Sequence, residues 1–262
     1  MPKSGRRNTK TGSPAREQQQ TPGGGPGPRR VILGVFAHPD DETSGAGGTF
    51  TRYAREGVEI VVATATRGEQ GHLGTGDSKI PRADLPQVRE RELRRVLQSY
   101  GARPPVFLGY RDQEVKDADF AELTGKVHRV MMDTRPDVVI TFGPRGISDH
   151  DDHVTVHRAA VEAFHRYRES VSGARLYYVA IPKAFVEEVG MDLDGPEVDP
   201  HVLVDIAGTL AVKVQALRTY SSQQDAQQLA DMFEQRAPAF EGFHQAYPPW
   251  TVERTVAGFW ED

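Results

Sequence analysis

Residues 31–42 read VILGVFAHPDDE, an apolar run that passes directly into ionisable side chains. The run Val31–Phe36 is short and continuous, which predicts a strand that is buried on both faces. Strands of this kind belong to parallel sheets that helices cover on both sides. His38 to Glu42 follow the strand at once, so we expect them at its carboxyl end, where open parallel sheets form their ligand sites.

The alternation of strand and helix continues along the chain. Further buried strands are predicted over residues 58–65, 106–108, 138–142, 176–181 and 202–206, and helices over 46–56, 87–100, 120–134, 152–167 and 210–220. This order predicts an α/β fold with a mainly parallel sheet and helices on both faces, in one domain over residues 29–262. No clear period follows Gln223, so we expect the remainder to be peripheral.

The first 28 residues differ in composition from the rest. They are rich in Gly, Pro, Ser, Thr, Gln and charge, and a segment of this kind cannot bury enough apolar surface to offset its ordering entropy. Residues 1–30 carry seven Lys and Arg against one Glu, a balance of +6, in a chain whose net charge is -5. We therefore expect residues 1–28 to be a disordered basic tail on an acidic body.

Composition also narrows the chemistry. The chain has no cysteine, which excludes disulfides, Cys-ligated zinc and thiol nucleophiles. Any metal must be held by His and carboxylates. The acidic body argues against nucleic acid as the main partner. No stretch approaches the roughly 20 apolar residues of a membrane helix, and no apolar core follows the basic start as in a secretory signal. We expect a cytoplasmic protein without a transmembrane segment, and self-association into a homo-oligomer stays open.

Ionisable residues gather after four predicted strands. They occupy residues 38–42 (HPDDE), 66–69 (TRGE), 109–112 (GYRD) and 143–153. Because the carboxyl ends of parallel strands meet at one edge of the sheet, we expect these loops to form a single site.

The first and last of these loops carry metal-ligand chemistry. His38 and Asp41 are three residues apart, so both can face one point where the strand turns into a helix, and imidazole and carboxylate are zinc ligands. The segment 149–153 (DHDDH) adds two His and three Asp, whose like charges favour a nearby cation. Each run alone is also explained by ordinary helix-start chemistry, since Asp and Glu are favoured in a first turn. Two His and one Asp with an open fourth position is the catalytic pattern for zinc, although the same set suits Fe²⁺.

The sequence resembles the PIG-L/LmbE-like deacetylase family over about residues 30–225. The resemblance rests on six motifs in the right order, namely AHPDDE (37–42), TRGE (66–69), RxxEL (Arg89, Glu92, Leu93), LGYRD (108–112), HxxH (His150, His153) and KxxAL…SQ (Lys213, Ala216, Leu217, Ser222, Gln223). It implies a Rossmann-like fold and zinc-dependent removal of an acyl group, usually acetyl, from an N-acetylglucosamine conjugate or related amino sugar.

The resemblance also implies a role for individual residues. His38, Asp41 and His153 correspond to the zinc ligands. Catalytic roles fall to three further residues, in which Asp40 is the general base, His150 stabilises the oxyanion and Asp152 orients His150. Arg89 and Asp112 correspond to contacts with substrate hydroxyls. The partner implied is a small N-acylated amino-sugar substrate.

The chain departs from the family pattern at three positions. Asp151 stands where Pro is usual, Ser148 where some members have Tyr, and Tyr220 where many have His. Two alternatives stay open. One is a different zinc amidase on the same scaffold, such as a thiol-conjugate amidase. The other is a non-catalytic binding domain, although no G-x-G-x-x-G for a dinucleotide follows the first strand.

Overall fold

The computed structural model describes residues 29–74, 79–236 and 239–261, together with Met1. Apart from Met1, the predicted basic tail over residues 1–28 lies outside the described residues. Among the described residues, no helix has the length and apolar character needed to cross a membrane.

The core of the molecule is one seven-stranded sheet of order β3-β2-β1-β4-β5-β7-β6. The neighbouring strands β3, β2, β1, β4 and β5 are parallel, and β7 is antiparallel to both of its neighbours, β5 and β6. The strands are β1 (Val31–Phe36), β2 (Glu59–Thr64), β3 (Val106–Phe107), β4 (Val138–Thr141), β5 (Arg175–Ala180), β6 (Val202–Asp205) and β7 (Phe240–Tyr247). The predicted α/β class with a mainly parallel sheet is confirmed.

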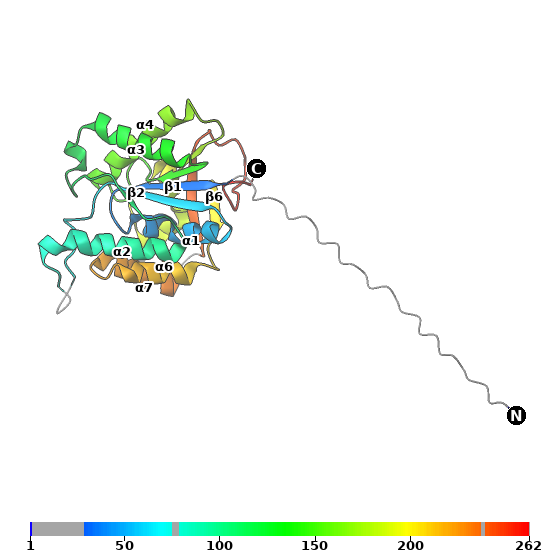
Figure 1. Cartoon of the computed structure of the whole chain (residues 1–262), viewed down its shortest axis with the longest axis horizontal. Helices are drawn as coiled ribbons and strands as arrows, with labels where there is room; N and C mark the ends of the chain where they lie inside the picture. Colours follow the sequence, from blue (N-terminus) through cyan, green and yellow to red (C-terminus); the bar gives the residue numbers. More distant parts are fainter. Residues whose placement is uncertain (2–28, 75–78, 237–238, 262) are drawn as a thin grey trace.

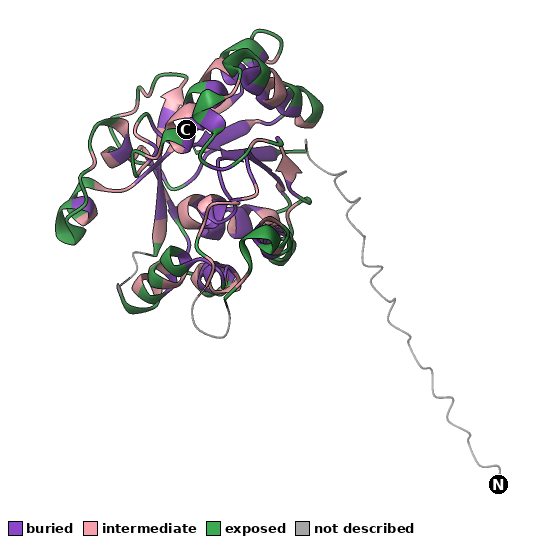
Figure 2. Cartoon of the chain, turned by 90° about the vertical axis from the view of Figure 1, so that its left-hand side faces the viewer, coloured by how far each residue is buried: buried purple, intermediate pink, exposed green. Residues whose placement is uncertain are grey.

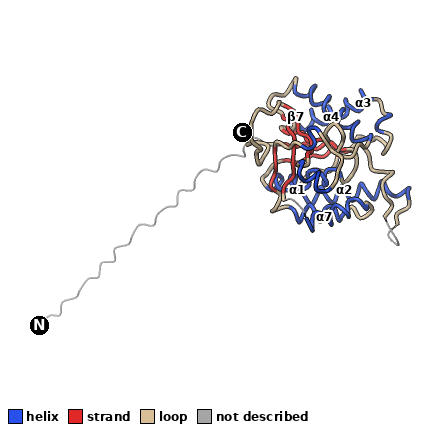
Figure 3. Tube along the Cα trace, turned by 180° about the vertical axis from the view of Figure 1, so that it is seen from behind, coloured by secondary structure: helices blue, strands red, loops and turns tan. Residues whose placement is uncertain are grey.

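Helices cover both faces of the sheet. Helices α3 and α4 lie on one face, and α1, α2, α6 and α7 on the other (Figures 1 and 3). The strands between the two layers are largely buried (Figure 2). The helices are α1 (Asp41–Arg55), α2 (Leu85–Tyr100), α3 (Phe120–Thr134), α4 (Asp151–Arg168), α5 (Lys183–Val189), α6 (Leu210–Thr219) and α7 (Gln224–Arg236), with short 3-10 turns η2 (Arg82–Asp84), η3 (Val115–Asp117) and η4 (Gly195–Val198).

The expectation that the chain after Gln223 is peripheral was wrong. This region forms α7, and it forms β7, which lies between β5 and β6 inside the sheet. The sequence of β7, FEGFHQAY, contains a glycine and three polar residues, which hides its strand character. Gly242 is required there because a Cβ would lie 2.5 Å from the carbonyl oxygen of Ala180 on β5.

Helix α1 begins at Asp41, five residues earlier than the predicted start at residue 46. The early turns contain three glycines, which have low helix propensity and weaken the helical signal in the sequence. The structure uses this small size for packing, since a Cβ on Gly48 would lie 2.8 Å from Ile206. Tertiary packing therefore outweighs local propensity here.

A buried ion pair joins α6 and β7 to α1. The Lys213 ammonium donates to Glu241 at 2.6 Å and to the Ser44 carbonyl at 2.8 Å. The Glu241 carboxylate also accepts from the backbone N–H groups of Gly48 and Thr49, at 3.0 and 2.7 Å. The pair thus satisfies two backbone donors and one backbone acceptor of α1. Lys213 belongs to the late sequence motif, and its role in the structure is to link α6 to β7 and α1.

We expect Glu241→Ala to lower the free energy of unfolding by about 3–5 kcal/mol, because it leaves the Lys213 charge buried without its partner. Denaturant unfolding measures the change. The matched control is Glu162→Ala, which removes an exposed pair with Arg166 on α4 and should cost about 1 kcal/mol or less. Equal losses in the two variants would contradict the stabilising role of the buried pair.

Candidate metal and catalytic site

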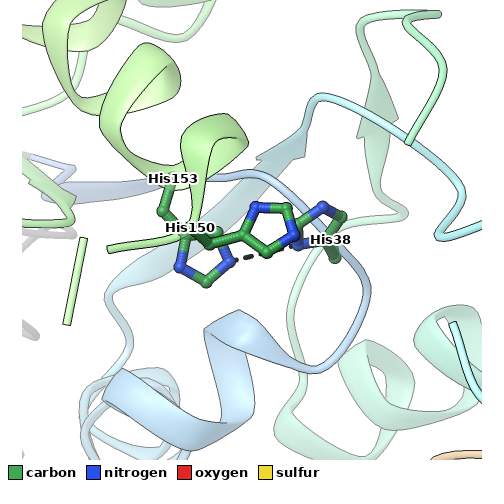
Figure 4. A group of neighbouring side chains, drawn as sticks. All are labelled: His38, His150 and His153. Atoms are coloured by element: carbon green, nitrogen blue, oxygen red, sulfur yellow. Dashed lines mark hydrogen bonds between the residues drawn. The ribbon is translucent and has the colours of Figure 1, made fainter. Parts of the chain in front are cut away.

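The predicted site residues meet where β1 and β4 lie side by side. His38 follows β1, and His150 and His153 lie at the start of α4, which follows β4 (Figure 4). These segments are 115 residues apart in sequence, yet His38 Nδ1 lies 3.1 Å from His153 Nε2. The two predicted ligand clusters therefore come together at the carboxyl edge of the sheet.

Asp41 lies against both of these histidines. One carboxylate oxygen is 3.5 Å from His38 Nδ1, and the other is 3.4 Å from His153 Nε2. The first oxygen also accepts from the His38 backbone N–H at 2.7 Å, which fixes the carboxylate in place. Ligand atoms around one zinc ion at bond lengths of about 2.0–2.2 Å are separated by similar distances. The residues of the predicted triad therefore fit a shared cation.

The outer hydrogen bonds decide which ring nitrogens point at this spot. His153 Nδ1 donates to the Gly146 carbonyl at 2.9 Å, so Nε2 of a neutral ring carries a free lone pair. His38 Nε2 lies 3.1 Å from Asp112 and 3.2 Å from Asp152, which assigns its proton to that side. The inner atoms, His38 Nδ1 and His153 Nε2, then face each other and need a cation between them, either a proton or a metal.

The pKa values of His38 and Asp41 also show that this site favours a positive charge. Burial alone would lower the pKa of His38, but the hydrogen bonds that its ring donates to Asp112 and Asp152 raise it well above its usual value. Burial works to raise the pKa of Asp41, yet His153 and His38 outweigh it and lower that pKa. Carboxylates that hold metal-ligating imidazoles in this way are typical outer partners of a metal site.

His150 contributes a third imidazole close to the other two. Its Nδ1 accepts from the Asp152 backbone N–H at 3.2 Å, so a neutral ring carries its proton on Nε2. Burial and the neighbouring His38 and His153 lower the pKa of His150, which favours this neutral form. His38, His150 and His153 together are one of the groups that could hold a metal.

Asp152 occupies a different position from the one expected. The resemblance implies that its carboxylate orients His150, but that carboxylate instead contacts His38 and accepts from the backbone N–H groups of Gln113 at 2.7 Å and Val115 at 3.2 Å. Only the backbone N–H of Asp152 binds His150. The side chain is fully buried, and it links the loop after β3 to the ring of His38.

Asp40 points to a different partner from that of its neighbour Asp41. One of its carboxylate oxygens accepts from Arg89 Nη2 at 2.8 Å. Arg89 is buried and also donates to the carbonyls of Pro39 and Gly68, so it joins three of the sequence motifs. Burial raises the pKa of Asp40 well above its usual value, and Arg89 opposes this rise. The Arg89 guanidinium is thus engaged mainly with protein atoms.

Backbone strain is concentrated in the loops of this site. Four of the five non-glycine residues with positive φ among those described lie here, namely Asp40, Gln113, Ile147 and Asp149. Ile147 has φ 65°, which is costly for a β-branched side chain. Conformations of this kind cost about 1–3 kcal/mol each and persist where surrounding contacts enforce them, often at functional sites.

A polar cavity of about 220 Å³ opens beside the histidines. Arg89 and Asp112, the predicted substrate contacts, both line it. Its other polar walls come from Gln70, His72, Gln113, Gln223 and Asp225. Gln223 of the late motif exchanges hydrogen bonds with the His72 backbone, which holds the loop after β2 against this cavity.

Glu197 is a residue of this region that the sequence analysis missed. Its buried carboxylate accepts from the backbone N–H groups of Arg145 at 3.0 Å and Ile147 at 2.8 Å, and so shapes the loop whose Gly146 carbonyl binds His153. The approach is close, since a Cβ on Gly143 would lie 2.1 Å from Glu197 Cγ. No sequence signal links position 197 to this loop, because the contact spans 50 residues without a motif.

We expect Glu197→Ala to destabilise the protein by about 1–3 kcal/mol for each of the two backbone donors left without a partner. The free energy of unfolding from a denaturant titration gives the value. Glu187→Ala, an exposed position on α5, is the control and should change it by less than about 0.5 kcal/mol. A Glu197→Ala protein as stable as the control would contradict the proposed support of the loop.

Comparison with known proteins adds an independent observation. Residues 33–164 match the family described as PIG-L, GlcNAc-PI de-N-acetylase. The chain is 34% identical over 244 residues to a 1D-myo-inositol 2-acetamido-2-deoxy-alpha-D-glucopyranoside deacetylase of Rhodococcus opacus (strain B4), covering 74% of this chain and 82% of that protein. The chain belongs to the PIG-L family. The resemblance noted in the sequence is confirmed.

Solved structures share the fold of this PIG-L chain. The N,N'-diacetylchitobiose deacetylase from Pyrococcus horikoshii has a TM-score of 0.64 at 22% identity and covers 82% of this chain and 83% of its own. A 4-carboxy-2-hydroxymuconate hydratase from Pseudomonas putida has a TM-score of 0.63 at 18% identity, covering 85% and 98%. At such identities the likeness shows the fold alone, and the two named reactions differ.

Proposed function

We propose that this PIG-L chain is a zinc-dependent hydrolase that removes the N-acyl group from an amino-sugar conjugate. The observation that carries the proposal is the convergence of His38, Asp41 and His153, whose inner atoms require a cation. Family membership and the named activity of the Rhodococcus relative support the reaction class. The polar cavity beside the histidines suits the hydroxyl groups of a sugar.

We assign metal binding to His38 Nδ1, the Asp41 carboxylate and His153 Nε2. Asp41 is preferred to His150 as the third ligand because its carboxylate contacts both of the other donors. Two imidazoles and one carboxylate form a typical catalytic zinc set. When bound there, zinc supplies a Lewis acid for the amide carbonyl and lowers the pKa of a water molecule.

Asp40 is proposed as the general base and Arg89 as its positioning residue. Arg89 holds one oxygen of the Asp40 carboxylate, and no hydrogen bond to the other oxygen is described, so that oxygen remains available for a proton. Burial raises the pKa of Asp40, which makes its carboxylate a stronger base toward a water proton. Asp40 can therefore accept a proton from water and return it to the leaving amine.

His150 is proposed as the donor to the developing oxyanion. Its neutral ring carries the proton on Nε2, the nitrogen that is free of the Asp152 backbone. A donor aimed at the developing charge contributes about 10²–10³-fold to the rate. Asp152 and Asp112 act through His38, because both carboxylates hold its outer nitrogen. Asp112 also lines the polar cavity and remains a candidate acceptor for a substrate hydroxyl.

We expect one divalent metal ion per chain, and loss of amide hydrolysis when a chelator removes it. The physical reason is that the free lone pairs of two histidines then lack their shared cation. Elemental analysis of the purified protein, with amine release measured before and after chelation, tests this. Recovery with Zn²⁺ supports zinc, and recovery only with Fe²⁺ assigns the metal as iron. Full activity in metal-free protein would overturn the proposal.

Neighbouring aspartates should respond differently to substitution. Asp41→Ala removes a ligand, so metal content and activity should fall together. Asp40→Asn keeps a hydrogen-bond acceptor for Arg89, so metal content should stay near one per chain while kcat falls by about 10²–10⁴-fold. His150→Ala should also keep the metal, with kcat lower by about 10²–10³-fold. Metal analysis and kcat on the same preparations decide the roles.

Asp151→Asn is the matched control for this series. Asp151 lies between His150 and His153, but it is exposed and pairs with Lys116. Metal content and kcat should therefore both stay unchanged. If Asp40→Asn loses metal as Asp41→Ala does, Asp40 is a ligand and the proposed base is wrong. If His150→Ala loses metal, His150 replaces Asp41 or joins it in the ligand set.

A further inference from the structure

A second cavity, of about 320 Å³, adjoins the proposed metal ligands Asp41 and His153 and is lined by neither Arg89 nor Asp112. The two cavities have Asp41, Ser148 and His153 in common. Pockets for small molecules span about 300–1,000 Å³, so this cavity has room for far more than the methyl of an acetyl group.

The walls of the second cavity are mainly apolar. They include Val179 near the end of β5, Ile181 just after it, Phe185 from α5, and Met232 and Phe233 from α7. Lys213 and Glu241 also line it, but they form the buried ion pair with each other and so offer no unpaired charge. An apolar cavity of this kind is favourable for a hydrocarbon group and unfavourable for sugar hydroxyls.

Exposed apolar side chains mark the rim of the same cavity. Val189 is 40% exposed and Met191 37% exposed, and both line it. They are two of the few large hydrophobic residues that are exposed in the described part of the chain. Exposed apolar side chains next to an apolar cavity are typical of a ligand-binding entrance.

We infer that the acyl group of the substrate extends beyond acetyl, and that its hydrocarbon chain binds in this apolar cavity. The inference rests on the proposed function, which places the scissile amide at Asp41 and His153. The amide bond has the sugar on its nitrogen side and the acyl chain on its carbonyl side. A sugar in the polar cavity then directs the acyl chain across the shared residues into the apolar one.

The arrangement of the two cavities also favours an acyl chain over an apolar aglycone as the occupant. An aglycone is attached to the sugar ring, so it would extend from the polar cavity, which is lined by Arg89, Asp112 and Asp225. Only the acyl group lies on the far side of the scissile bond. The apolar cavity therefore determines acyl-chain preference, with the entrance at Val189 and Met191.

The first experiment measures binding, which does not depend on turnover. The metal-loaded Asp40→Asn variant is titrated by calorimetry with N-acetyl-, N-butanoyl-, N-hexanoyl- and N-octanoyl-glucosamine. Each added methylene should tighten binding by about two- to fourfold, the upper value corresponding to about 0.8 kcal/mol for one buried methylene. An octyl glycoside of N-acetylglucosamine carries a chain of similar length on the aglycone and should bind no more tightly than N-acetylglucosamine itself.

The second experiment places a charge in the cavity. Met232→Asp on α7 should abolish the gain from chain length while leaving affinity for N-acetylglucosamine within about twofold. Gln228→Asp carries the same charge on an exposed position of the same helix and should preserve the full chain-length series. Melting temperatures of both variants identify any loss of folding, and Met191→Asp at the exposed rim provides a second probe with little structural cost.

The outcomes separate this inference from the proposed function. Binding that improves with acyl length and is lost in Met232→Asp supports the inference, even if the wild-type enzyme releases no amine, in which case the proposed function fails alone. Flat binding across the series overturns it, even if N-acetylglucosamine conjugates are hydrolysed. Tighter binding of the octyl glycoside than of N-octanoyl-glucosamine also overturns it, because the apolar cavity would then hold the aglycone.

Discussion

The direct pairing of β1 with β4 is the constraint on which the site depends. Strand β1 continues into α1 on one face of the sheet, and β4 leads to α4 on the other. The two connections diverge and leave a crevice between them, as open parallel sheets do where the strand order reverses. His38 enters this crevice from one side and His153 from the other. The topology thus brings the two histidines together, and the contacts with the Asp41 carboxylate and the Gly146 carbonyl orient their rings.

Much of this arrangement could be predicted from local sequence. Continuous apolar runs predicted the parallel strands, and the helix predicted over residues 87–100 does end at Tyr100, with Gly101 next in a left-handed conformation. Because the carboxyl ends of parallel strands meet at one edge of the sheet, His38 and the 149–153 segment were expected to lie together. Residues of different motifs also contact one another, since Glu92 accepts from Ser222 and Glu42 accepts from Tyr220. The Tyr220 hydroxyl donates to Glu42 at 2.6 Å, which joins the late motif to the first one.

What the sequence could not provide were contacts made by residues without a pattern. Glu197 supports the ligand loop from a 3-10 turn, and nothing around it resembles a site. The partners of Asp152 also depend on the path of the loop after β3, which brings the N–H groups of Gln113 and Val115 to its carboxylate. Strand β7 was not predicted because its own sequence is rich in polar residues. Its place in the sheet depends on pairing with β5 and β6, which are distant in sequence.

The position of β7 has a consequence for biosynthesis. Strand β6 pairs with β7, which begins 35 residues after β6 ends, so β6 has no ladder partner within the sheet until the segment 240–247 has been made. Because chains fold from the N-terminus as they leave the ribosome, the five parallel strands can assemble first, with β5 at an open edge. An unpaired edge is a template for pairing with other chains. Synthesis that pauses before residue 240 would therefore expose the nascent protein to edge-to-edge aggregation.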